Sequence, residues 1–245
     1  MGKIIFVASG KGGVGKSSFC ASLGFSFASM NKKVLLIDLD LGLRSLDFML
    51  GTQTPPIYNL ADILNERCEI AKAIIPLDDK YLLNLISAPI DSDEVINFDN
   101  FKPLFEKLTK HYDFIIIDCG AGMQQIFKKS VIFADEVIIV TNPDCVSVRD
   151  ASVVSSYIYN LKINDIKLII NKVNLNFKQN ALTDFDKIID EIETPLLGVI
   201  PNDFNLSRLI TTGSLNQLGE KSFYNITINN IAQRLLGKNI PLLIN

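Results

Sequence analysis

A glycine-rich segment near the start of the chain carries the residues best suited to chemistry. Residues 10–17 match the pattern GxxxxGK[ST] and follow the apolar run KIIFVA directly. Glycines let backbone N–H groups converge on a phosphate, and the N-terminus of a following helix adds its dipole. Lys16 would bring a positive charge to the terminal phosphates, and the Ser17 hydroxyl can ligate Mg²⁺. We therefore predict a nucleoside triphosphate site, with a chance match on a glycine-rich turn as the alternative. Its predicted residues are Gly10, Lys11, Gly12, Gly13, Val14, Gly15, Lys16, Ser17 and Ser18.

Three aspartates that follow apolar runs can act beside this triphosphate. Asp38 and Asp40 alternate in one extended segment, so both carboxylates can face the same way. Asp118 ends the run DFIIID, where a carboxylate suits Mg²⁺, held directly or through water. We predict that Ser17, Asp38 and Asp118 form the metal region, and that the paired acids orient an attacking water. The alternatives are solvated turn residues for Asp38 and Asp40, and a helix N-cap for Asp118.

Two further strand ends suit the base of the nucleotide. Asn171, followed by Lys172, offers a donor and an acceptor that match the N6/N7 edge of adenine. The segment Pro201, Asn202 and Asp203 could form a wall beside the base. Either segment could equally be a simple turn.

A second group of polar residues opens the helical segment after NPD. Ser147 is expected to cap this helix, and Asp150 would favour its first turn through the helix dipole. Arg149 could serve a dimer or partner surface. The one histidine, His111, lies in the polar connection TKHYD, so the sequence offers no candidate for histidine-based catalysis.

Strand-like and helical segments alternate along the chain and would position these residues. Several strand-like runs are apolar at nearly every position, which is typical of strands covered on both faces of a parallel sheet. The alternation predicts an α/β fold, a doubly wound and mostly parallel sheet with helices on both faces, in one domain over residues 1–245. Ligands in such sheets bind beyond the carboxyl ends of the strands. Strands are expected at Lys3–Ala8, Lys33–Asp38, Tyr81–Ala88, Asp113–Asp118, Glu136–Thr141, Ile166–Lys172 and Leu196–Pro201, and helices at Lys16–Met30, Asn100–His111, Val146–Leu161, Leu182–Glu191 and Glu220–Leu236.

The composition describes a protein with a large core. Of 245 residues, 48% are hydrophobic and 21% charged, and the net charge is -3. This acidic balance argues against broad binding to nucleic acid. The four cysteines show no metal or cluster spacing, and Cys119 is expected to be buried packing. No apolar run approaches the roughly 18 residues of a spanning helix, so we expect a cytoplasmic protein.

The motifs together resemble the MinD/ParA family of P-loop ATPases. The loop KGGVGKSS is the deviant Walker A form of this family, and the segments DLDLGLRSLD and SVRDA favour its MinD branch. The similarity continues almost to the end of the chain in family order. The further segments are IYNLADIL, DFIIIDCGAGMQQIF, LIINKVN, LLGVIP and IAQRLLG.

The resemblance implies an ATP-dependent dimerising switch that regulates placement of the division septum. ATP and Mg²⁺ would be held between two copies of the chain, with Lys11 of each copy reaching the phosphates bound by the other. Lys16 and Asp40 would join Lys11 as catalytic residues, with Asp40 positioning the water, while Asp38 and Asp118 organise the metal region. Slow hydrolysis to ADP would separate the dimer, and a partner protein of the MinC or MinE type would stimulate it.

Two features depart from the MinD branch. Gly120 stands where proline is usual, and GAG after Asp118 is similar to FlhG, the regulator of flagellar placement and number. The family's C-terminal membrane-binding helix is basic and amphipathic, whereas Pro241 breaks a helix here and no cation follows Lys238. The protein could still lie at the inner face of the membrane if a partner supplied the attachment.

Three other classes remain as alternatives. A DNA-partition ATPase of the ParA kind needs a basic face, against which the acidic total argues. A metal-cluster ATPase needs cysteine pairs at the dimer axis, and Cys119 alone lies near the predicted switch. A small-molecule kinase or ligase would leave Lys11 without a role.

Overall fold

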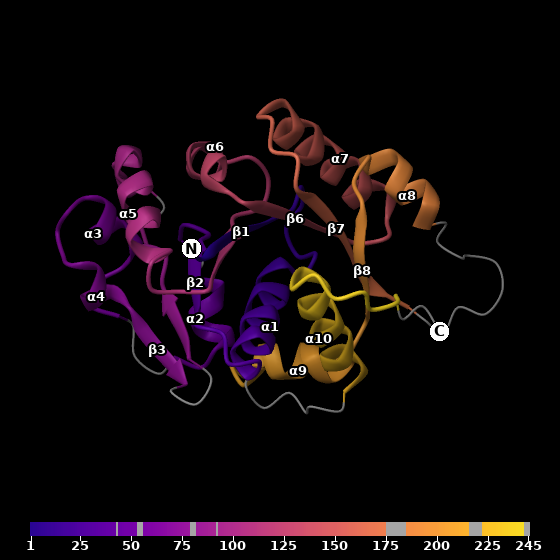
Figure 1. The fold of residues 1–245 in the computed structure, drawn as a ribbon, viewed down its shortest axis with the longest axis horizontal. Coiled ribbons are helices and arrows are strands. Elements are labelled where there is room, and N and C mark those ends of the chain that lie inside the picture. Colours follow the sequence, from indigo (N-terminus) through magenta and orange to yellow (C-terminus); the bar gives the residue numbers. More distant parts are fainter. Residues whose placement is uncertain are drawn as a thin grey trace.

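The described residues of the computed structural model form one eight-stranded sheet (Figure 1). They comprise residues 1–42, 44–52, 56–78, 82–91, 93–174, 185–215 and 222–242. The strand order is β3-β4-β2-β5-β1-β6-β7-β8. The strands are β1 (Lys3–Ala8), β2 (Val34–Leu39), β3 (Ile75–Asp78), β4 (Leu83–Ile86), β5 (Phe114–Cys119), β6 (Glu136–Thr141), β7 (Ile166–Val173) and β8 (Leu196–Pro201).

All neighbouring strands pair in parallel except β3 and β4, which form an antiparallel pair at one edge. The predicted α/β class and its mostly parallel sheet are confirmed. The edge strand β3 was not predicted, because it has only four residues and one of them is a proline. The strand predicted from Tyr81 is confirmed over Leu83–Ile86, and Tyr81 itself lies outside the described residues.

The register of the central strands brings the predicted site residues to one edge of the sheet. Asp118 of β5 lies opposite Val7 of β1 and opposite Asp38 of β2. Strand β1 ends at Ala8, one residue beyond Val7, and the phosphate-binding loop follows, so the loop and both aspartates meet at the carboxyl ends of adjacent strands. Strands buried at nearly every position hold this register firmly, because a slip would expose apolar side chains.

Helices cover both faces of the sheet, as Figure 1 shows. One face packs against α1, α2, α9 and α10, and the other against α3 and α5 to α8. Two 3₁₀ turns, Phe98–Asn100 and Val131–Phe133, flank α5 and α6. The helices are α1 (Lys16–Ser29), α2 (Ser45–Met49), α3 (Leu60–Leu64), α4 (Ile70–Ala73), α5 (Phe101–Leu108), α6 (Gln125–Ser130), α7 (Cys145–Asn160), α8 (Phe185–Ile192), α9 (Phe204–Thr211) and α10 (Phe223–Leu235).

Helix α1 is buried almost all round, because it lies between the sheet and α10. Phe27 stacks on Phe114 of β5 with ring centroids 4.0 Å apart. On the opposite side the Ser26 hydroxyl lies 2.5 Å from Asn229, and the hydroxyl of Tyr224 donates to Ser22. The helix that begins at Lys16 is therefore fixed on two sides, which also fixes the loop in front of it.

The sequence predicted five helices, α1, α5, α7, α8 and α10, and missed α2, α3, α4, α6 and α9, although α9 is as long as α5 and α8. The predicted starts at Leu182 and Glu220 lie outside the described residues, and the observed helices run over Phe185–Ile192 and Phe223–Leu235. Helices α2, α3, α4 and α6 have only four to six residues, too few to show a helical period in the sequence. No helix in the described part of the chain is both long and apolar enough to span a membrane.

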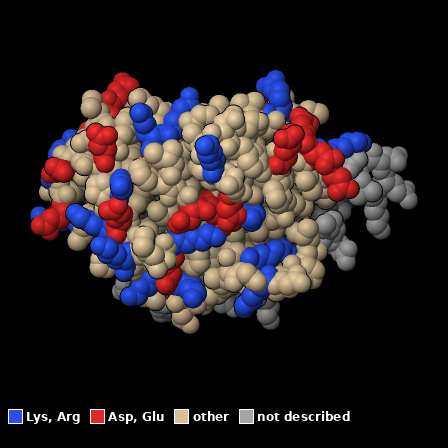
Figure 2. Space-filling model, turned by 45° about the horizontal axis from the view of Figure 1, so that its top comes forward, with Lys and Arg blue, Asp and Glu red and all other residues tan. Residues whose placement is uncertain are grey.

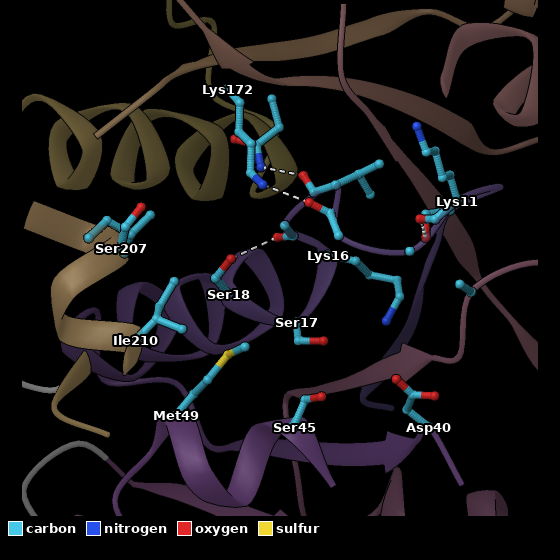
Figure 3. Close-up of a pocket in the computed structure, with 18 of the residues that line it drawn as sticks. Lys11, Lys16, Ser17, Ser18, Asp40, Ser45, Met49, Lys172, Ser207 and Ile210 are labelled. Atoms are coloured by element: carbon cyan, nitrogen blue, oxygen red, sulfur yellow. Dashed lines mark hydrogen bonds between the residues drawn. The ribbon is translucent and has the colours of Figure 1, made fainter. Parts of the chain in front are cut away.

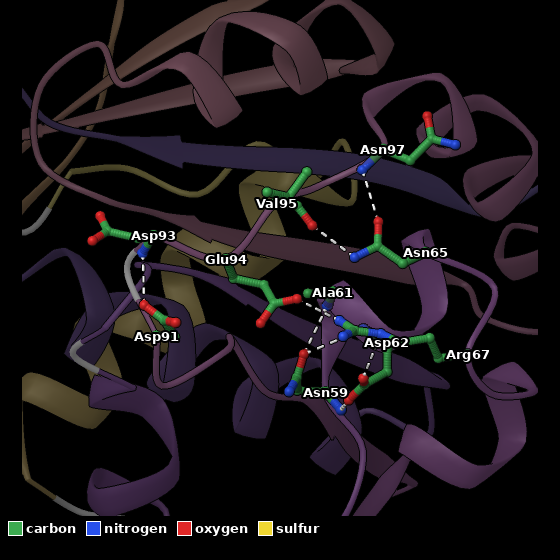
Figure 4. A network of polar contacts seen from close by, with 10 residues as sticks. All are labelled: Asn59, Ala61, Asp62, Asn65, Arg67, Asp91, Asp93, Glu94, Val95 and Asn97. Carbon is green, nitrogen blue, oxygen red and sulfur yellow. Dashed lines mark hydrogen bonds and ion pairs between the residues drawn. The ribbon is translucent and has the colours of Figure 1, made fainter.

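Helix α3 shows how local hydrogen bonds define a helix of this length. Asn59 and Asp62 form a reciprocal capping box at its start. Just after it, Arg67 pairs with Asp62 and with Glu94, at 3.0 and 2.6 Å, and Asn65 donates to the Val95 carbonyl (Figure 4). This network ties the segment after β4 to α3, although exposed ion pairs of this kind add little stability each.

A buried carboxylate pairs with a lysine at the opposite edge of the sheet from the loop. Glu136 at the start of β6 is 1% exposed and is paired with Lys3 of β1. Burial raises the pKa of Glu136, while Lys3 opposes that rise. Lys3 therefore keeps a buried carboxylate ionised, and its removal would leave that charge without its partner.

We expect Lys3→Met to lower the free energy of unfolding by roughly 1–3 kcal/mol near neutral pH. Because Glu136 then has a still higher pKa in the folded state, the loss should shrink as pH falls and Glu136 is protonated. Urea denaturation at about pH 4 and about pH 8 measures this. The double variant Lys3→Met with Glu136→Gln is the control and should lose this pH dependence. An equal loss at both pH values in Lys3→Met would contradict the pairing.

Candidate functional site

The loop between β1 and α1 has the backbone shape of an anion-binding site. Gly13 and Gly15 have positive φ angles of 78° and 93°, which residues with side chains rarely adopt. Gly15 occupies the N-cap position of α1, and no side chain caps the helix there. The first N–H groups of α1 are consequently available to a phosphate, and the helix dipole favours negative charge at this point.

The end of β7 holds this loop from behind. The side-chain nitrogen of Asn171 donates to the Val14 carbonyl at 2.7 Å, and Lys172 donates to the Gly13 carbonyl at 2.6 Å. A Cβ atom on Gly15 would lie 2.2 Å from the Asn171 nitrogen, so this contact requires glycine. Asn171 is 6% exposed. With the carbonyls held on this side, the N–H groups can face the pocket.

This contact changes the interpretation of Asn171. The sequence predicts a paired donor and acceptor contact with adenine, but in this conformation one of the two amide hydrogens is already used by Val14. The second hydrogen and the side-chain oxygen remain for a base. The bracing role follows from proximity in the fold, which the sequence around Asn171 does not reveal.

Lys16 and Asp118 form a buried ion pair at the centre of the site. The Lys16 ammonium lies 2.5 Å from Oδ1 of Asp118, and their side chains are 7% and 0% exposed. Burial alone lowers the pKa of Lys16, but the charge of Asp118 and its hydrogen bond reverse this and raise the pKa overall. Lys16 therefore stays a cation at all physiological pH values, as phosphate binding requires.

The second oxygen of Asp118 gives the site a candidate for metal binding. Oδ2 is buried and has no hydrogen-bond partner among the described residues. An unpaired buried carboxylate oxygen is costly, so it suits a ligand that is part of the working site. Ser17 lines the pocket in front of the loop and offers a hydroxyl, whereas Asp118 is fully buried and is not among the residues that line it. These hard oxygen atoms fit Mg²⁺, which takes few protein ligands and completes its shell with phosphate and water. The described residues hold no group of three or more His, Cys, Asp or Glu side chains arranged as a metal site.

Asp38 and Asp40 have different environments, although the sequence predicts that both carboxylates face the phosphate site. Asp38 is fully buried and accepts hydrogen bonds from the backbone nitrogens of Asp40 and Leu46, at 2.8 and 3.3 Å. Burial and the nearby charge of Asp118 raise the pKa of Asp38. Asp40 is only half-buried and lines the pocket, with its pKa raised mainly by burial. Asp38 thus shapes the segment that presents Asp40, and the solvated-turn alternative is wrong for Asp38.

The pocket in front of the loop has a volume of about 520 Å³, within the range of small-molecule sites (Figure 3). The loop, Asp40, Asn171 and the Pro201–Asp203 segment all line it, as predicted from the sequence. Lys16 and Ser17 lie on the side facing Asp40, and Met49 and Ile210 lie at the other end. The further lining residues that the sequence did not predict are Ser9, Ser45, Met49, Ala121, Gln124, Leu206, Ser207 and Ile210.

The apolar end of the pocket comes from two short helices. Met49 belongs to α2, and Leu206 and Ile210 belong to α9. Asp203 caps α9 by accepting from the backbone nitrogens of Asn205 and Leu206, at 2.8 and 3.2 Å. A capping aspartate before apolar residues spaced three to four apart is a sequence signal that could have revealed α9.

Four residues of the predicted set lie away from the pocket centre. Asp38 and Asp118 are fully buried and do not line the pocket. Gly10 is not among the lining residues, because its Cα faces the backbone of Asp150 in α7, 2.3 Å from where a Cβ would be. Lys11 lines the pocket edge and is exposed, and its side chain extends away from Lys16 in Figure 3. Its ammonium is therefore poorly placed for phosphates bound by its own loop.

Helix α7 begins earlier than predicted, which corrects two assignments. Asp144 is its N-cap and accepts from both the backbone nitrogen and the hydroxyl of Ser147, so Ser147 is not the cap. Hydrogen bonds from Ser147 lower the pKa of Asp144. Asp150 lies beyond the first turn, where the dipole effect is weak. Arg149 is largely exposed and pairs with Asp150.

Two buried cysteines flank the Lys16–Asp118 pair. Cys119 is fully buried, which confirms the expectation of packing, and burial raises its pKa. Cys20 of α1 is also fully buried and lies 3.5 Å from Oδ1 of Asp118 as a thiol donor. Asp118 is itself inside β5, so its predicted alternative as a helix cap is wrong.

Comparison with known proteins agrees with this site. Residues 2–170 match a family model described as an AAA domain. The chain is 40% identical to the septum site-determining protein MinD of Synechocystis, over 99% of this chain and 92% of that protein. Among solved structures it is similar to the MinC:MinD cell division protein complex of Aquifex aeolicus, with 32% identity, 98% of each chain covered and a TM-score of 0.90. It is also similar to MinD complexed with Mg-ADP from Pyrococcus horikoshii, with 26% identity, coverage of 97% and 98%, and a TM-score of 0.81.

The contact between Asn171 and the loop leads to a test. Asn171→Asp replaces a donor by a carboxylate facing the Val14 carbonyl, so the loop should lose its shape and the Kd for ATP should rise about 10- to 100-fold. Titration with a fluorescent ATP analogue measures this. Asn160→Asp, at an exposed position of α7, is the matched control and should bind normally. Unchanged affinity in Asn171→Asp would mean that the contact does not shape the loop.

Proposed function

The chain belongs to the MinD family of septum site-determining ATPases, and from this premise we propose how its site works. As a member of this family it is an ATPase that regulates septum placement. We propose that the whole chain, residues 1–245, acts as a single P-loop ATPase domain. Its output is a change between two states: a dimer with ATP bound and a separated form after hydrolysis. The observation that carries this proposal is the glycine loop that presents free N–H groups beside a buried Lys16–Asp118 pair.

The phosphates would occupy the loop, with Lys16 reaching the terminal ones. Exposed backbone N–H groups of Gly12 to Ser18 would bind phosphate oxygens, and Lys16 would turn from Asp118 toward them. Mg²⁺, as carried by the Pyrococcus horikoshii relative with ADP, would neutralise charge on the phosphates when bound. Ser17 and the free oxygen of Asp118 would hold it, and Asp38 would keep the neighbouring segment in place.

The base would lie at the apolar end of the pocket. Pro201, Asn202 and Asp203 line one side, and Met49 and Ile210 provide apolar surface for a flat ring. Asn171 could accept a hydrogen bond from the base through its oxygen, while one of its two amide hydrogens holds the loop. These contacts would favour a purine nucleotide without needing a large rearrangement.

Asp40 is proposed to position the attacking water. Its carboxylate lines the pocket on the side of Lys16, and it is only half-buried, so water can reach it. The water would donate a hydrogen bond to Asp40 and direct a lone pair at the terminal phosphorus. Hydrolysis would be slow without a partner, because phosphoryl transfer depends on positioning, and Asp40 lies on a short segment with few fixed contacts.

Lys11 is proposed to act across a dimer. It is exposed and extends away from its own Lys16, so it is available to a second copy placed against this face. Two chains would then share two nucleotides, and each Lys11 would neutralise charge on the other chain's phosphates. Loss of the terminal phosphate would remove this attraction and separate the copies.

A protein of the MinC type is the proposed partner, because a similar MinD chain forms a complex with MinC. A MinE-type protein would stimulate hydrolysis. We propose a cytoplasmic protein that joins the inner face of the membrane peripherally. Nucleic acid is a poor partner, because acidic and basic residues lie side by side on the face in Figure 2 instead of forming a basic patch.

One observation favours a second candidate, a regulator of flagellar placement of the FlhG kind. Gly120 gives the segment after β5 the sequence GAG, which is similar to that group.

We expect the ATP-bound protein to bind a MinC-type protein at micromolar concentration and the ADP-bound protein not to, as measured by biolayer interferometry. Binding to a flagellar partner instead, with none to MinC, would favour the second candidate.

The role of Lys11 gives a further test. Lys11→Ala should bind a non-hydrolysable ATP analogue with nearly normal affinity, because its side chain points away from the pocket, but should not dimerise. Light scattering after gel filtration measures the mass with analogue and Mg²⁺ present. Lys102→Ala, an exposed lysine of α5 far from the loop, is the control and should dimerise as the wild type does. A normal dimer in Lys11→Ala would refute the role across the interface.

A further inference from the structure

Gln124 lines the pocket, yet none of the roles above uses it. It precedes α6 at the N-cap position, but its side chain makes no capping hydrogen bond. Its backbone carbonyl alone serves the helix, by accepting from Lys128. The side-chain amide of Gln124 is therefore free of a structural task in the described part of the chain.

The amide of Gln124 and the carboxylate of Asp40 converge on one point. A Cβ atom placed on Gly120 would lie 3.0 Å from both amide atoms of Gln124 and 3.1 Å from Oδ1 of Asp40. The amide atoms of Gln124 and Oδ1 of Asp40 are thus at most about 6 Å apart. One water that lies about 2.8 Å from each group can therefore contact both side chains. Glycine at position 120 leaves the space that brings them together.

The segment that carries Gln124 is fixed to the phosphate-binding loop. The backbone nitrogen of Gly122 donates to the Ser9 carbonyl at 2.9 Å, directly in front of the loop. Gly120 itself follows β5, whose register with β1 and β2 places Asp118 and Asp38. Gln124 is consequently held on the same side of the pocket as Asp40 and Lys16, where the terminal phosphate would lie.

A glutamine has the chemistry that Asp40 lacks. An ionised aspartate only accepts hydrogen bonds, whereas glutamine both donates and accepts. A water poised for attack needs acceptors for its two protons, and a phosphate oxygen beside it needs a donor. Asp40 and the Gln124 oxygen could accept from the water, while the Gln124 nitrogen donates to the phosphate. Glutamines perform this task in other P-loop enzymes.

We propose that Gln124 is a second catalytic residue, which orients the attacking water together with Asp40. The water oxygen forms a bond to the terminal phosphorus, and the bond from that phosphorus to the bridging oxygen breaks. The electron pair of the broken bond goes to ADP, and the water's protons pass to the released phosphate and to solvent. The assignment rests on ATP hydrolysis at the proposed site.

Single-turnover hydrolysis of labelled ATP tests the proposal. Gln124→Ala and Gln124→Leu should lower the rate of hydrolysis by about 10-fold or more, because the attacking water loses one of the two side chains that orient it. Their Kd for ATP should change by less than about 2-fold, since the loop makes most of the contacts with bound ATP and Gln124 acts mainly on the attacking water. The control is Gln125→Ala, a neighbouring exposed glutamine of α6 that does not line the pocket, which should keep the wild-type rate.

The double variant of Gln124→Ala with Asp40→Ala adds a test of shared action. If both residues hold one water, the double variant should be hardly slower than Asp40→Ala alone. Wild-type rates in Gln124→Ala and Gln124→Leu would overturn the proposal. A parallel loss of ATP affinity and thermal stability would overturn it too, because it would indicate a structural role. If neither the wild type nor Gln125→Ala hydrolyses ATP, the proposed function fails and this inference with it.

Discussion

The buried pair of Lys16 and Asp118 is the interaction on which the site depends. A lysine on α1 and an aspartate on β5 are both withdrawn from water, and each is tolerated because the other is 2.5 Å away. The pairing keeps Lys16 charged, and the other Asp118 oxygen has no hydrogen-bond partner among the residues that the structure describes. A nucleotide with its metal ion would satisfy both groups at once, because phosphate takes the lysine and the cation takes the carboxylate. The site thus offers one positive and one negative side chain to a ligand that consists of an anion and a cation.

The positions of all other site residues follow from the register of the central strands. β1, β2 and β5 end side by side, so the loop, Asp38 and Asp118 meet without any long connection. Strand β7, two places from β1 in the sheet, supplies Asn171 to brace the loop carbonyls. The sheet is a rigid frame buried on both faces, and the segments that carry Asp40 and Gln124 lie at its edge. A change at the terminal phosphate can therefore move these segments without disturbing the core.

The pocket also joins parts of the chain that are far apart in the sequence. Met49 of α2 follows the segment of Asp40, and Ile210 of α9 follows the segment of Asp203. The helices α2 and α9 that line the pocket thus each follow a segment that also contributes a residue to the pocket. Lys11 extends outward from the same loop that holds the phosphates, which suits a site completed by a second copy.

The sequence alone determined the fold class, the central strands, the long helices and the core of the phosphate site. The sequence predicts the phosphate site because glycines at fixed spacing, a lysine and a serine follow a buried run, and few sites other than a phosphate site have this pattern. It predicts a parallel sheet because the strand-like runs are apolar at nearly every position. Four pieces needed the tertiary structure. Short helices such as α2 and α6 have no period to detect, and Asn171 braces a loop that lies 157 positions away along the chain. The sequence pairs Asp38 with Asp40, but only the fold makes one buried and the other accessible to water. The convergence of Gln124 and Asp40 over Gly120 likewise depends on how two loops pack, and pairwise proximity between distant segments leaves no mark on local sequence.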